Sequence, residues 1–198
     1  MSVVHTQLLR LSGLGESAPE VERHLESWIE ASSPSQLIGL IDPGSLALLK
    51  DAFSQAGGCE GTVWLIDRQG GELVACYNSG EESDLLVGFR QPVGQGIISM
   101  VFAQQQPYCE NDIEASVGHD DTLDRKIAKH TTAMIAVPFY FAFGLRGVIS
   151  CVQLAEAPRA REGFRSADVE TLARASNLLE RLINGTLLTS LLGLGDGV

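Results

Sequence analysis

Thiols are the most reactive side chains in this sequence, and their spacing limits what they could do. Cys59, Cys76, Cys109 and Cys151 lie far apart, and no two of them form a C-x-x-C pair. This spacing argues against a structural zinc site and against a disulfide framework, and it suits the reducing conditions of a cytoplasm. We therefore expect a cytoplasmic protein in which Cys59, Cys76 and Cys151 are small buried side chains.

A glycine-rich segment could surround a phosphate group. Gly94 and Gly96 are followed by Ile97, Ile98 and Ser99. A dinucleotide-binding loop would need a third glycine where Ser99 stands, and it would need a surrounding unit of strand, helix and parallel strand that the sequence does not predict. The two glycines are instead expected to let the backbone turn tightly into a helix.

The densest group of charged side chains could offer oxygen ligands to a divalent cation. Its members are Glu110, Asp112, Glu114, His119, Asp120, Asp121 and Asp124. Their spacing matches no calcium-binding loop, and clustered acids are commonly a solvated surface, so we predict no metal ion. The sequence also lacks the serine, histidine and acid around a glycine elbow that a hydrolase needs.

The overall charge narrows the range of partners. Lys and Arg number 14 against 25 Asp and Glu, which gives a net charge of −11 in 198 residues. A surface this negative repels the phosphates of nucleic acids and of anionic lipids, so we expect neither nucleic acid nor membrane as a partner. The N-terminus has no secretory signal pattern, and the longest uncharged run is shorter than the ~20 residues that a membrane-spanning helix needs.

Hydrophobic periodicity and turn residues predict helices that alternate with antiparallel strand pairs. The predicted helices are one that Pro19 opens, one from residue 44 or 45 to 55, one from 96 to about 105, and a long last one with Ser166 as its N-cap; a linker covers 31–35. The predicted strands are 62–67, 72–77, 107–109, 132–141 and 147–154. Neighbouring antiparallel strands favour an α+β fold.

Four segments of the chain resemble, in order, the GAF domain, a small-molecule-sensing module of signalling proteins. They are GTVWLIDRQGGELVACYNSG, QPVGQGIISMVFAQQQPYCEND, TTAMIAVPFYFAFGLRGVISCVQLAE and FRSADVETLARASNLLERL. The resemblance implies a GAF/PAS-like α+β fold, in which a central six-stranded antiparallel sheet has helices on both faces, a long C-terminal helix and a ligand pocket on one face. We expect a helical extension and linker over 1–34, the GAF domain over 35–192 and a flexible tail over 193–198.

The resemblance also implies where a ligand would bind. By position, the nucleotide-contacting places of the family fall on Thr62, Ser79, Ile97, Ile98, Asp124, Thr131 and Gln153. We expect Tyr108 and Met134 to line the same pocket. Ser79 and Gln153 stand where cyclic-nucleotide binders have acids, so cyclic-nucleotide binding is a disfavoured alternative. The helix after the glycine loop starts beside this pocket in the family, so its N–H groups could hold an anionic ligand. The ligand and any cofactor stay unknown.

Two other branches of the family depend on cysteine. By the resemblance, residues 111–130 are expected to form a lid over the pocket. Bilin photoreceptors bind their chromophore through a thiol in this lid, but here it contains no cysteine. Free methionine sulfoxide reductases use cysteines around the glycine-loop helix and the lid, where this chain has Ser99 and Met100, and Cys109 has no evident resolving partner. We therefore expect that the protein is not an enzyme, with thiol redox chemistry at Cys109 as an alternative.

The last helix carries more apolar surface than packing on one sheet requires. One stripe contains Val169, Leu172, Ser176, Leu179 and Ile183, and a second contains Ala175, Leu178, Leu182, Leu187 and Leu188. GAF domains often pair through such terminal helices, so we expect a homodimer. Alternatively, both stripes pack within the chain, against the N-terminal helix around Leu25 and Trp28.

These expectations combine into one leading hypothesis and one alternative of another class. The leading hypothesis is a non-enzymatic, bacterial-type GAF signalling module that senses an unidentified small molecule and acts through a helical dimer interface, on a signalling protein in trans. The alternative is a GAF fold without ligand that serves as a dimerisation or scaffold module. In that case large side chains of the chain itself would fill the pocket, namely Phe89, Tyr108, Met134 or Phe139.

Overall fold

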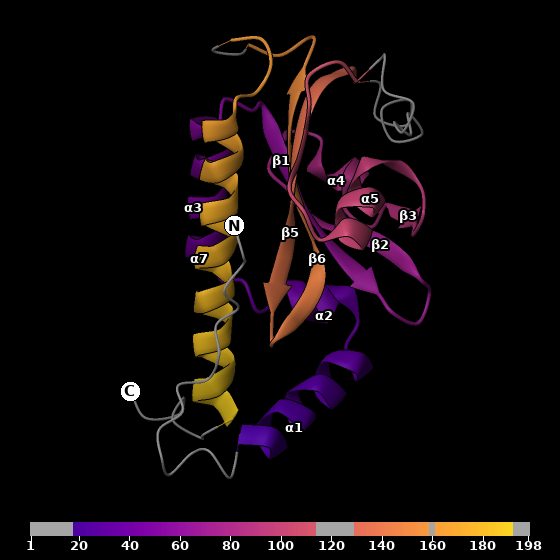
Figure 1. Ribbon diagram of the computed structural model, residues 1–198, viewed down its shortest axis with the longest axis vertical. Coiled ribbons are helices and arrows are strands. Elements are labelled where there is room, and N and C mark those ends of the chain that lie inside the picture. The colour runs from indigo at the N-terminus through magenta and orange to yellow at the C-terminus, as the bar shows by residue number, and fades with distance from the viewer. Residues whose placement is uncertain (1–17, 114–128, 159–160, 192–198) are drawn as a thin grey trace.

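A six-stranded antiparallel sheet forms the centre of the computed structural model, which describes residues 18–113, 129–158 and 161–191 (Figure 1). Within these residues the strand order is β3-β2-β1-β6-β5-β4. The strands are β1 (Glu60–Asp67), β2 (Glu72–Asn78), β3 (Arg90–Pro92), β4 (Tyr108–Glu110), β5 (Thr131–Phe141) and β6 (Gly144–Leu154). The predicted fold class is therefore confirmed.

Helices cover both faces of the sheet. Figure 1 shows α3 and α7 on one face, called the α7 face below, and α4 and α5 on the other, called the α5 face. The helices α1 and α2 lie at the end of the sheet that is nearer the C-terminal end of α7. The described helices are α1 (Ala18–Ala31), α2 (Pro34–Ile38), α3 (Pro43–Gln55), α4 (Ser83–Leu86), α5 (Gly96–Gln104) and α7 (Ser166–Leu191).

The predicted linker over 31–35 is wrong in part, because α2 begins inside it. The side chain of Ser33 accepts a hydrogen bond from Gln36 N, and Gln36 Oε1 accepts one from Ser33 N at 2.8 Å. This capping box satisfies the first free N–H groups of the helix, and Pro34 at its first position has the backbone angle that a helix needs. The short elements β3 and α4 were not predicted either.

The long helix α7 begins and ends differently from its prediction. Ser166 is its first residue rather than its N-cap, and the carboxylate of Asp168 accepts a hydrogen bond from Arg165 N at 2.7 Å. The helix then continues through Gly185, where the sequence suggests a bend or a stop. Ile183 and Leu187, on either side of this glycine, are buried in the core and hold that turn to the protein.

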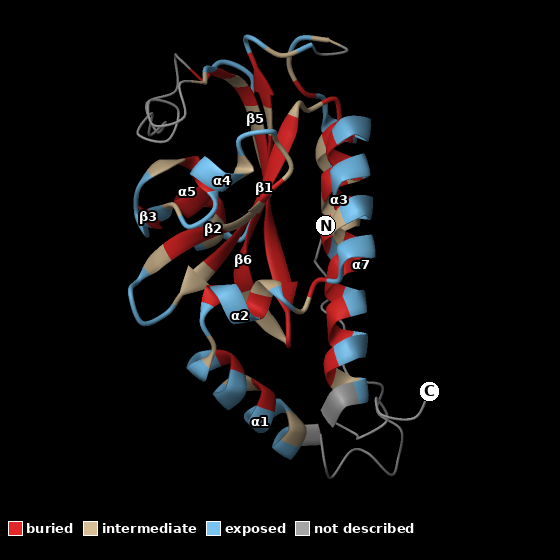
Figure 2. Cartoon of the chain, turned by 180° about the vertical axis from the view of Figure 1, so that it is seen from behind, coloured by how far each residue is buried: buried red, intermediate tan, exposed pale blue. Residues whose placement is uncertain are grey.

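Side chains of β1 alternate between the two cores. Val63 and Leu65 belong to the cluster on the α7 face, whereas Trp64 belongs to the cluster on the α5 face. The inner side of α7 is buried and its outer side is exposed (Figure 2). Leu25 and Ile29 of α1 lie in the same cluster as the α7 side chains, so the helix of the N-terminal extension packs on this core.

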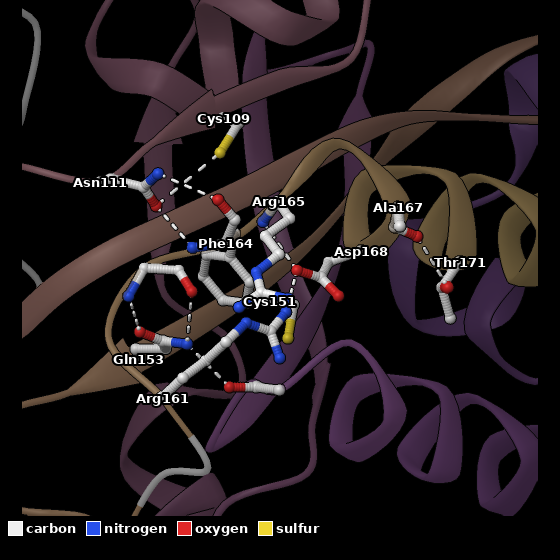
Figure 3. Close-up of polar contacts among 12 residues, drawn as sticks. Cys109, Asn111, Cys151, Gln153, Arg161, Phe164, Arg165, Ala167, Asp168 and Thr171 are labelled. Atoms are coloured by element: carbon white, nitrogen blue, oxygen red, sulfur yellow. Dashed lines mark hydrogen bonds and ion pairs between the residues drawn. The ribbon is translucent and has the colours of Figure 1, made fainter.

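Two side-chain amides fix the loop before α7 to the sheet (Figure 3). Gln153 Nε2 donates to Gly57 O at 2.9 Å, and Gln153 Oε1 accepts from Gly163 N at 2.8 Å. Asn111 Oδ1 accepts from Phe164 N at 2.7 Å, and Asn111 Nδ2 donates to Phe164 O at 3.0 Å. The two amides therefore satisfy backbone groups of the loop that would otherwise lack partners.

Asp168 closes this network at the start of α7. Its Oδ2 forms an ion pair with Arg161 Nη2 and also accepts the hydrogen bond from Arg165 N. Burial alone would raise the pKa of Asp168, but the hydrogen bonds from Arg161 and Arg165 outweigh it and hold this pKa below its ordinary value. The ionised carboxylate thus stabilises the folded state.

Replacing Asp168 should change how the stability depends on pH. Because its pKa is lower in the folded state, the ionised group stabilises the fold above the unfolded-state pKa of about 4, and this contribution is lost as the pH falls through the folded-state value. We expect Asp168→Asn to lower the free energy of unfolding at pH 7 by about 1–3 kcal/mol and to flatten its decrease below about pH 5. Urea unfolding at a series of pH values measures both effects. Asp51→Asn, at an exposed position of α3, is the matched control, and equal pH slopes in wild type and Asp168→Asn would contradict the prediction.

Candidate functional site

A row of polar side chains interrupts the apolar α5 face where β1 and β2 pair. Thr62 and Asn78 are register partners, and both are buried. Asn78 Nδ2 donates to Thr62 Oγ1 at 3.0 Å, and Asn78 Oδ1 accepts from Gly80 N at 2.7 Å. The amide therefore lies between a strand hydroxyl and the loop that leaves β2.

An indole extends this polar row toward β6. Trp64 Nε1 donates to Ser150 Oγ at 3.0 Å, and Ser150 belongs to the strand that pairs with β1 on the other side. Trp64 is 2% exposed and Ser150 is 3% exposed. The ring of Phe89 meets the indole edge-on, with the ring centroids 6.3 Å apart. An indole with both an apolar body and a satisfied N–H is suited to a site that binds organic groups.

A largely buried ion pair lies at the start of β1. Lys129 Nζ is 2.7 Å from Glu60 Oε2, and Glu82 Oε2 is 3.6 Å from the same ammonium group. Glu60 lies two residues before Thr62 on the same strand, so its side chain points to the same face. Among the described residues, two carboxylates thus lie beside one ammonium group, which gives these three side chains a net negative charge.

Apolar side chains of α5, β4 and β5 surround the row. Ile97, Ile98, Tyr108 and Met134 all pack in or against the cluster that contains Trp64. The phenol of Tyr108 donates to Glu110 Oε2 at 3.1 Å, and this hydrogen bond raises the pKa of Tyr108 above its ordinary value. The structure thus brings these predicted site residues together with Thr62 on one face.

The glycine loop before α5 is held by two polar side chains. Gln91 Nε2 donates to Gln95 O at 2.7 Å, and Ser99 Oγ accepts a hydrogen bond from Gly94 N. Gly94 and Gly96 have φ values of 101° and 72°, which residues with a β-carbon rarely adopt. Ser99 therefore supports the loop at the place where a dinucleotide-binding loop has its third glycine.

The remaining predicted site residues are placed differently. Gln153 lies apart from the site, because it faces α3 and the loop before α7 and both ends of its amide bind backbone there. Ser79 exchanges two hydrogen bonds with the backbone of Gly61, with its hydroxyl accepting from Gly61 N at 2.9 Å. Thr131 is buried at the start of β5. Asp124, like most of the predicted lid, lies outside the described residues.

Sequence reasoning missed several members of the row, namely Glu60, Trp64, Asn78, Lys129 and Ser150. The alternation of polar and apolar residues in β1 was the available signal for Glu60 and Trp64. Asn78 and Ser150 depend on which strand positions face each other, and this register is set by the fold. Lys129 lies before β5 and meets Glu60 only in the folded chain.

Three of the four thiols have pKa values above the ordinary value of a cysteine. Burial raises the pKa of Cys76 to about 11 and also raises the pKa values of Cys109 and Cys151. Raised values keep a thiol protonated, and the thiolate is the reactive form. Cys151 is fully buried, as predicted, whereas Cys59 and Cys76 are only partly buried.

Among the described residues, no group of three or more His, Cys, Asp or Glu side chains that could hold a metal ion is found. Across the same residues, none of the helices combines the length and the apolar character needed to span a membrane.

Comparisons with known proteins identify the fold. No family model matches the sequence, and no curated protein matches it. Among solved structures, a free methionine-R-sulfoxide reductase from Neisseria meningitidis, in complex with its substrate, is 22% identical over 92% of this chain and 96% of its own, with a TM-score of 0.54. The GAF domain of a two-component sensor histidine kinase from Bacillus halodurans is 14% identical over 76% of this chain and 99% of its own, with a TM-score of 0.57. The GAF domain of a phosphoenolpyruvate-protein phosphotransferase from Coxiella burnetii is 16% identical over 88% of this chain and 95% of its own, with a TM-score of 0.56. On this likeness, together with the strand order and the two helical layers, the chain has the fold of a GAF domain.

Proposed function

We propose that this chain is a non-enzymatic sensing module that binds a small molecule on the α5 face and passes its state on through its terminal helices. The row of buried polar side chains around Trp64 carries this proposal. Burying a hydroxyl, an amide or an ion pair brings little net stability, and apolar side chains of similar volume would pack at least as well. Recognition of a ligand gives these polar groups a purpose that packing does not. Structural neighbours that are GAF domains of signalling proteins support the same function.

The charges of the site favour a neutral or cationic ligand. Glu60 and Glu82 face the single ammonium group of Lys129, so an anion would meet net repulsion at this end of the row. The phosphate of a cyclic nucleotide is therefore poorly matched to this end. A ligand would have to replace hydrogen bonds that the site already contains, such as the one from Trp64 to Ser150.

A ligand-free pairing module is the second candidate, and low exposure of the site favours it. Thr62 is 6% exposed, and Phe89, Tyr108 and Met134 pack against the apolar cluster around Trp64. These are three of the side chains expected to fill the pocket of a module that has lost its ligand. The two candidates differ in whether the purified protein retains a small molecule.

Native mass spectrometry of the purified full chain, compared with its denatured mass, separates the two candidates. For a sensor, we expect a native mass per chain that exceeds 21.2 kDa by the mass of a retained small molecule. Ser150→Ala removes a hydroxyl that would bind the ligand once the Trp64 N–H changes partner, and it should reduce the retained fraction about fivefold, because a hydrogen bond contributes about 1 kcal/mol. Ser176→Ala removes a buried hydroxyl on the α7 face, which donates to Pro138 O, and serves as the control. Equal native and denatured masses per chain would favour the pairing module instead.

The outer side of α7 supports pairing with a second copy of this chain. Leu178 and Leu182 are one helical turn apart and are 46% and 41% exposed, and Leu48 of the neighbouring helix α3 is also exposed. Leu187, which was expected in the same stripe, is buried in the core instead. An exposed apolar strip along one helix can meet its own copy across a two-fold axis and so cover both strips at once.

Charged substitutions on this strip should separate the two copies. We expect wild type to have twice the mass of one chain in light scattering, and the double variant Leu178→Glu, Leu182→Glu to have the mass of one chain, since burying the carboxylates in an apolar interface is unfavourable. Leu85→Glu is a matched control because Leu85 is equally apolar and exposed, but lies on α4 at the opposite face. A wild type with the mass of one chain, or an equal loss of pairing in the Leu85 control, would contradict the predicted interface.

A thiol redox enzyme is the remaining alternative, since a sulfoxide reductase is among the structural neighbours. The raised pKa of Cys109 argues against it, because the thiol stays protonated near neutral pH. We expect no reduction of free methionine sulfoxide by wild type in the presence of dithiothreitol, and no difference for Cys109→Ser. Turnover by wild type that Cys109→Ser abolishes would overturn the non-enzymatic proposal.

A further inference from the structure

The turn between β5 and β6 has a backbone that needs outside support. Ala142 and Phe143 have φ values of 45° and 60°, in the left-handed region that glycine usually occupies in such two-residue turns. Non-glycine residues in this region are strained and persist where surrounding contacts hold them. Both polar groups of the Ala142 backbone have such contacts.

The first contact comes from β6 and continues to α1. Arg146 is fully buried, and its guanidinium donates to Phe141 O at 3.1 Å and to Ala142 O at 2.8 Å. The same guanidinium pairs with Glu26 of α1, at 3.1 Å between Nη2 and Oε2 and 3.5 Å between Nη1 and Oε1. The hydrogen bond from Arg146 lowers the pKa of Glu26, so the carboxylate stays ionised at neutral pH. Glu26 therefore balances a charge that the protein core surrounds.

The second contact comes from α7. Asn184 Oδ1 accepts a hydrogen bond from Ala142 N at 2.7 Å. The other polar atom of the amide, Asn184 Nδ2, is buried without a hydrogen-bond partner in the described part of the chain. The hydrogen bond from Ala142 N in the turn therefore holds the Asn184 side chain in place.

We propose that Glu26, Arg146, Ala142 and Asn184 form a joint through which the position of α1 determines how firmly the C-terminal half of α7 is held. Loss of Glu26 leaves the guanidinium of Arg146 buried without its counter-charge, which is strongly unfavourable. Arg146 then moves toward solvent and releases the carbonyl oxygen of Ala142. The strained turn relaxes, and Asn184 Oδ1 loses the hydrogen bond that it accepts from Ala142 N. Figure 1 shows α1, this turn and the C-terminal half of α7 at the same end of the molecule.

This joint goes beyond the proposed sensing function, because it assigns coupling between the two terminal helices to particular residues. The contacts connect elements that are far apart in sequence, since 120 residues separate Glu26 from Arg146 and 42 separate Ala142 from Asn184. It operates whether or not the α5 face binds a ligand. Its test can therefore fail without affecting the test of the sensor, and the reverse also holds.

Hydrogen exchange of the full chain, followed by mass spectrometry of its peptides, tests the joint. Glu26→Gln keeps the shape of the side chain and removes its charge. We expect it to raise exchange rates about tenfold or more in three places, namely α1, the β5–β6 turn and residues 180–189 of α7. Glu30→Gln is the matched control, because Glu30 lies on the same helix and pairs at 3.5 Å with Arg68 rather than with Arg146. A rise that Glu26→Gln confines to α1 would overturn the proposal, as would an equal effect of Glu30→Gln.

The reciprocal variant provides the second arm. Asn184→Ala should raise exchange in the turn and also in α1, because hydrogen bonds of the turn and of Arg146 connect Asn184 to Glu26. The double variant should exchange no faster in the turn than the more affected single variant, because both changes break the same connection. If Glu26→Gln fails to fold, Glu26→Asp keeps the charge on a shorter side chain and should give the same three-site pattern with smaller amplitude. Independent, additive effects of the two single variants would contradict the joint.

Discussion

Alternation of side chains along β1 is the constraint on which both faces of the protein depend. This strand lies between β2 and β6, so both of its edges are paired, and each of its faces packs in one of the two apolar clusters. Val63 and Leu65 supply the core under α7, while Trp64 supplies the polar row and its apolar surroundings. A slip by one residue would exchange the two sets. Gly61 and Gly147 help to hold the register, because a β-carbon at Gly61 would collide with a ring of α3 and one at Gly147 with the backbone of β1.

Polar contacts on the two faces differ in what they join. On the α7 face, Gln153 and Asn111 satisfy backbone groups of a loop, and such groups need partners in any folded arrangement. On the α5 face, Asn78 also binds a backbone group, but Trp64 binds the side chain of Ser150 and Asn78 binds that of Thr62. Contacts of the first kind cannot be given up without opening the loop. Contacts between side chains can change partners while the backbone stays in place, and this supports the proposal that a ligand binds on the α5 face.

Much of the fold could be predicted from the sequence, but the site could be predicted only in part. The strand pair β5 and β6 and the helix α7 are long and regular, so periodicity alone indicates them. The elements α2, α4 and β3 are three to five residues long, and such short pieces depend on caps and neighbouring strands more than on periodicity. Gln153 was expected in the site by its position in the family pattern, but on β6 its side chain faces the loop that follows α3. Ser150, three residues earlier on β6, faces Trp64 instead, and strand register decides which of the two reaches the site.

The ends of the sheet limit how copies of this chain can associate. Both outer strands, β3 and β4, are three residues long, and Pro92 at the end of β3 has no N–H to donate. Where β5 extends beyond β4, Pro138 likewise lacks an N–H, and its carbonyl oxygen is occupied by Ser176 of α7. Strand-to-strand polymerisation, the route to amyloid, therefore meets outer strands that are too short to template it. Association of copies through the edges of the sheet is therefore disfavoured, which agrees with the proposed pairing through α7.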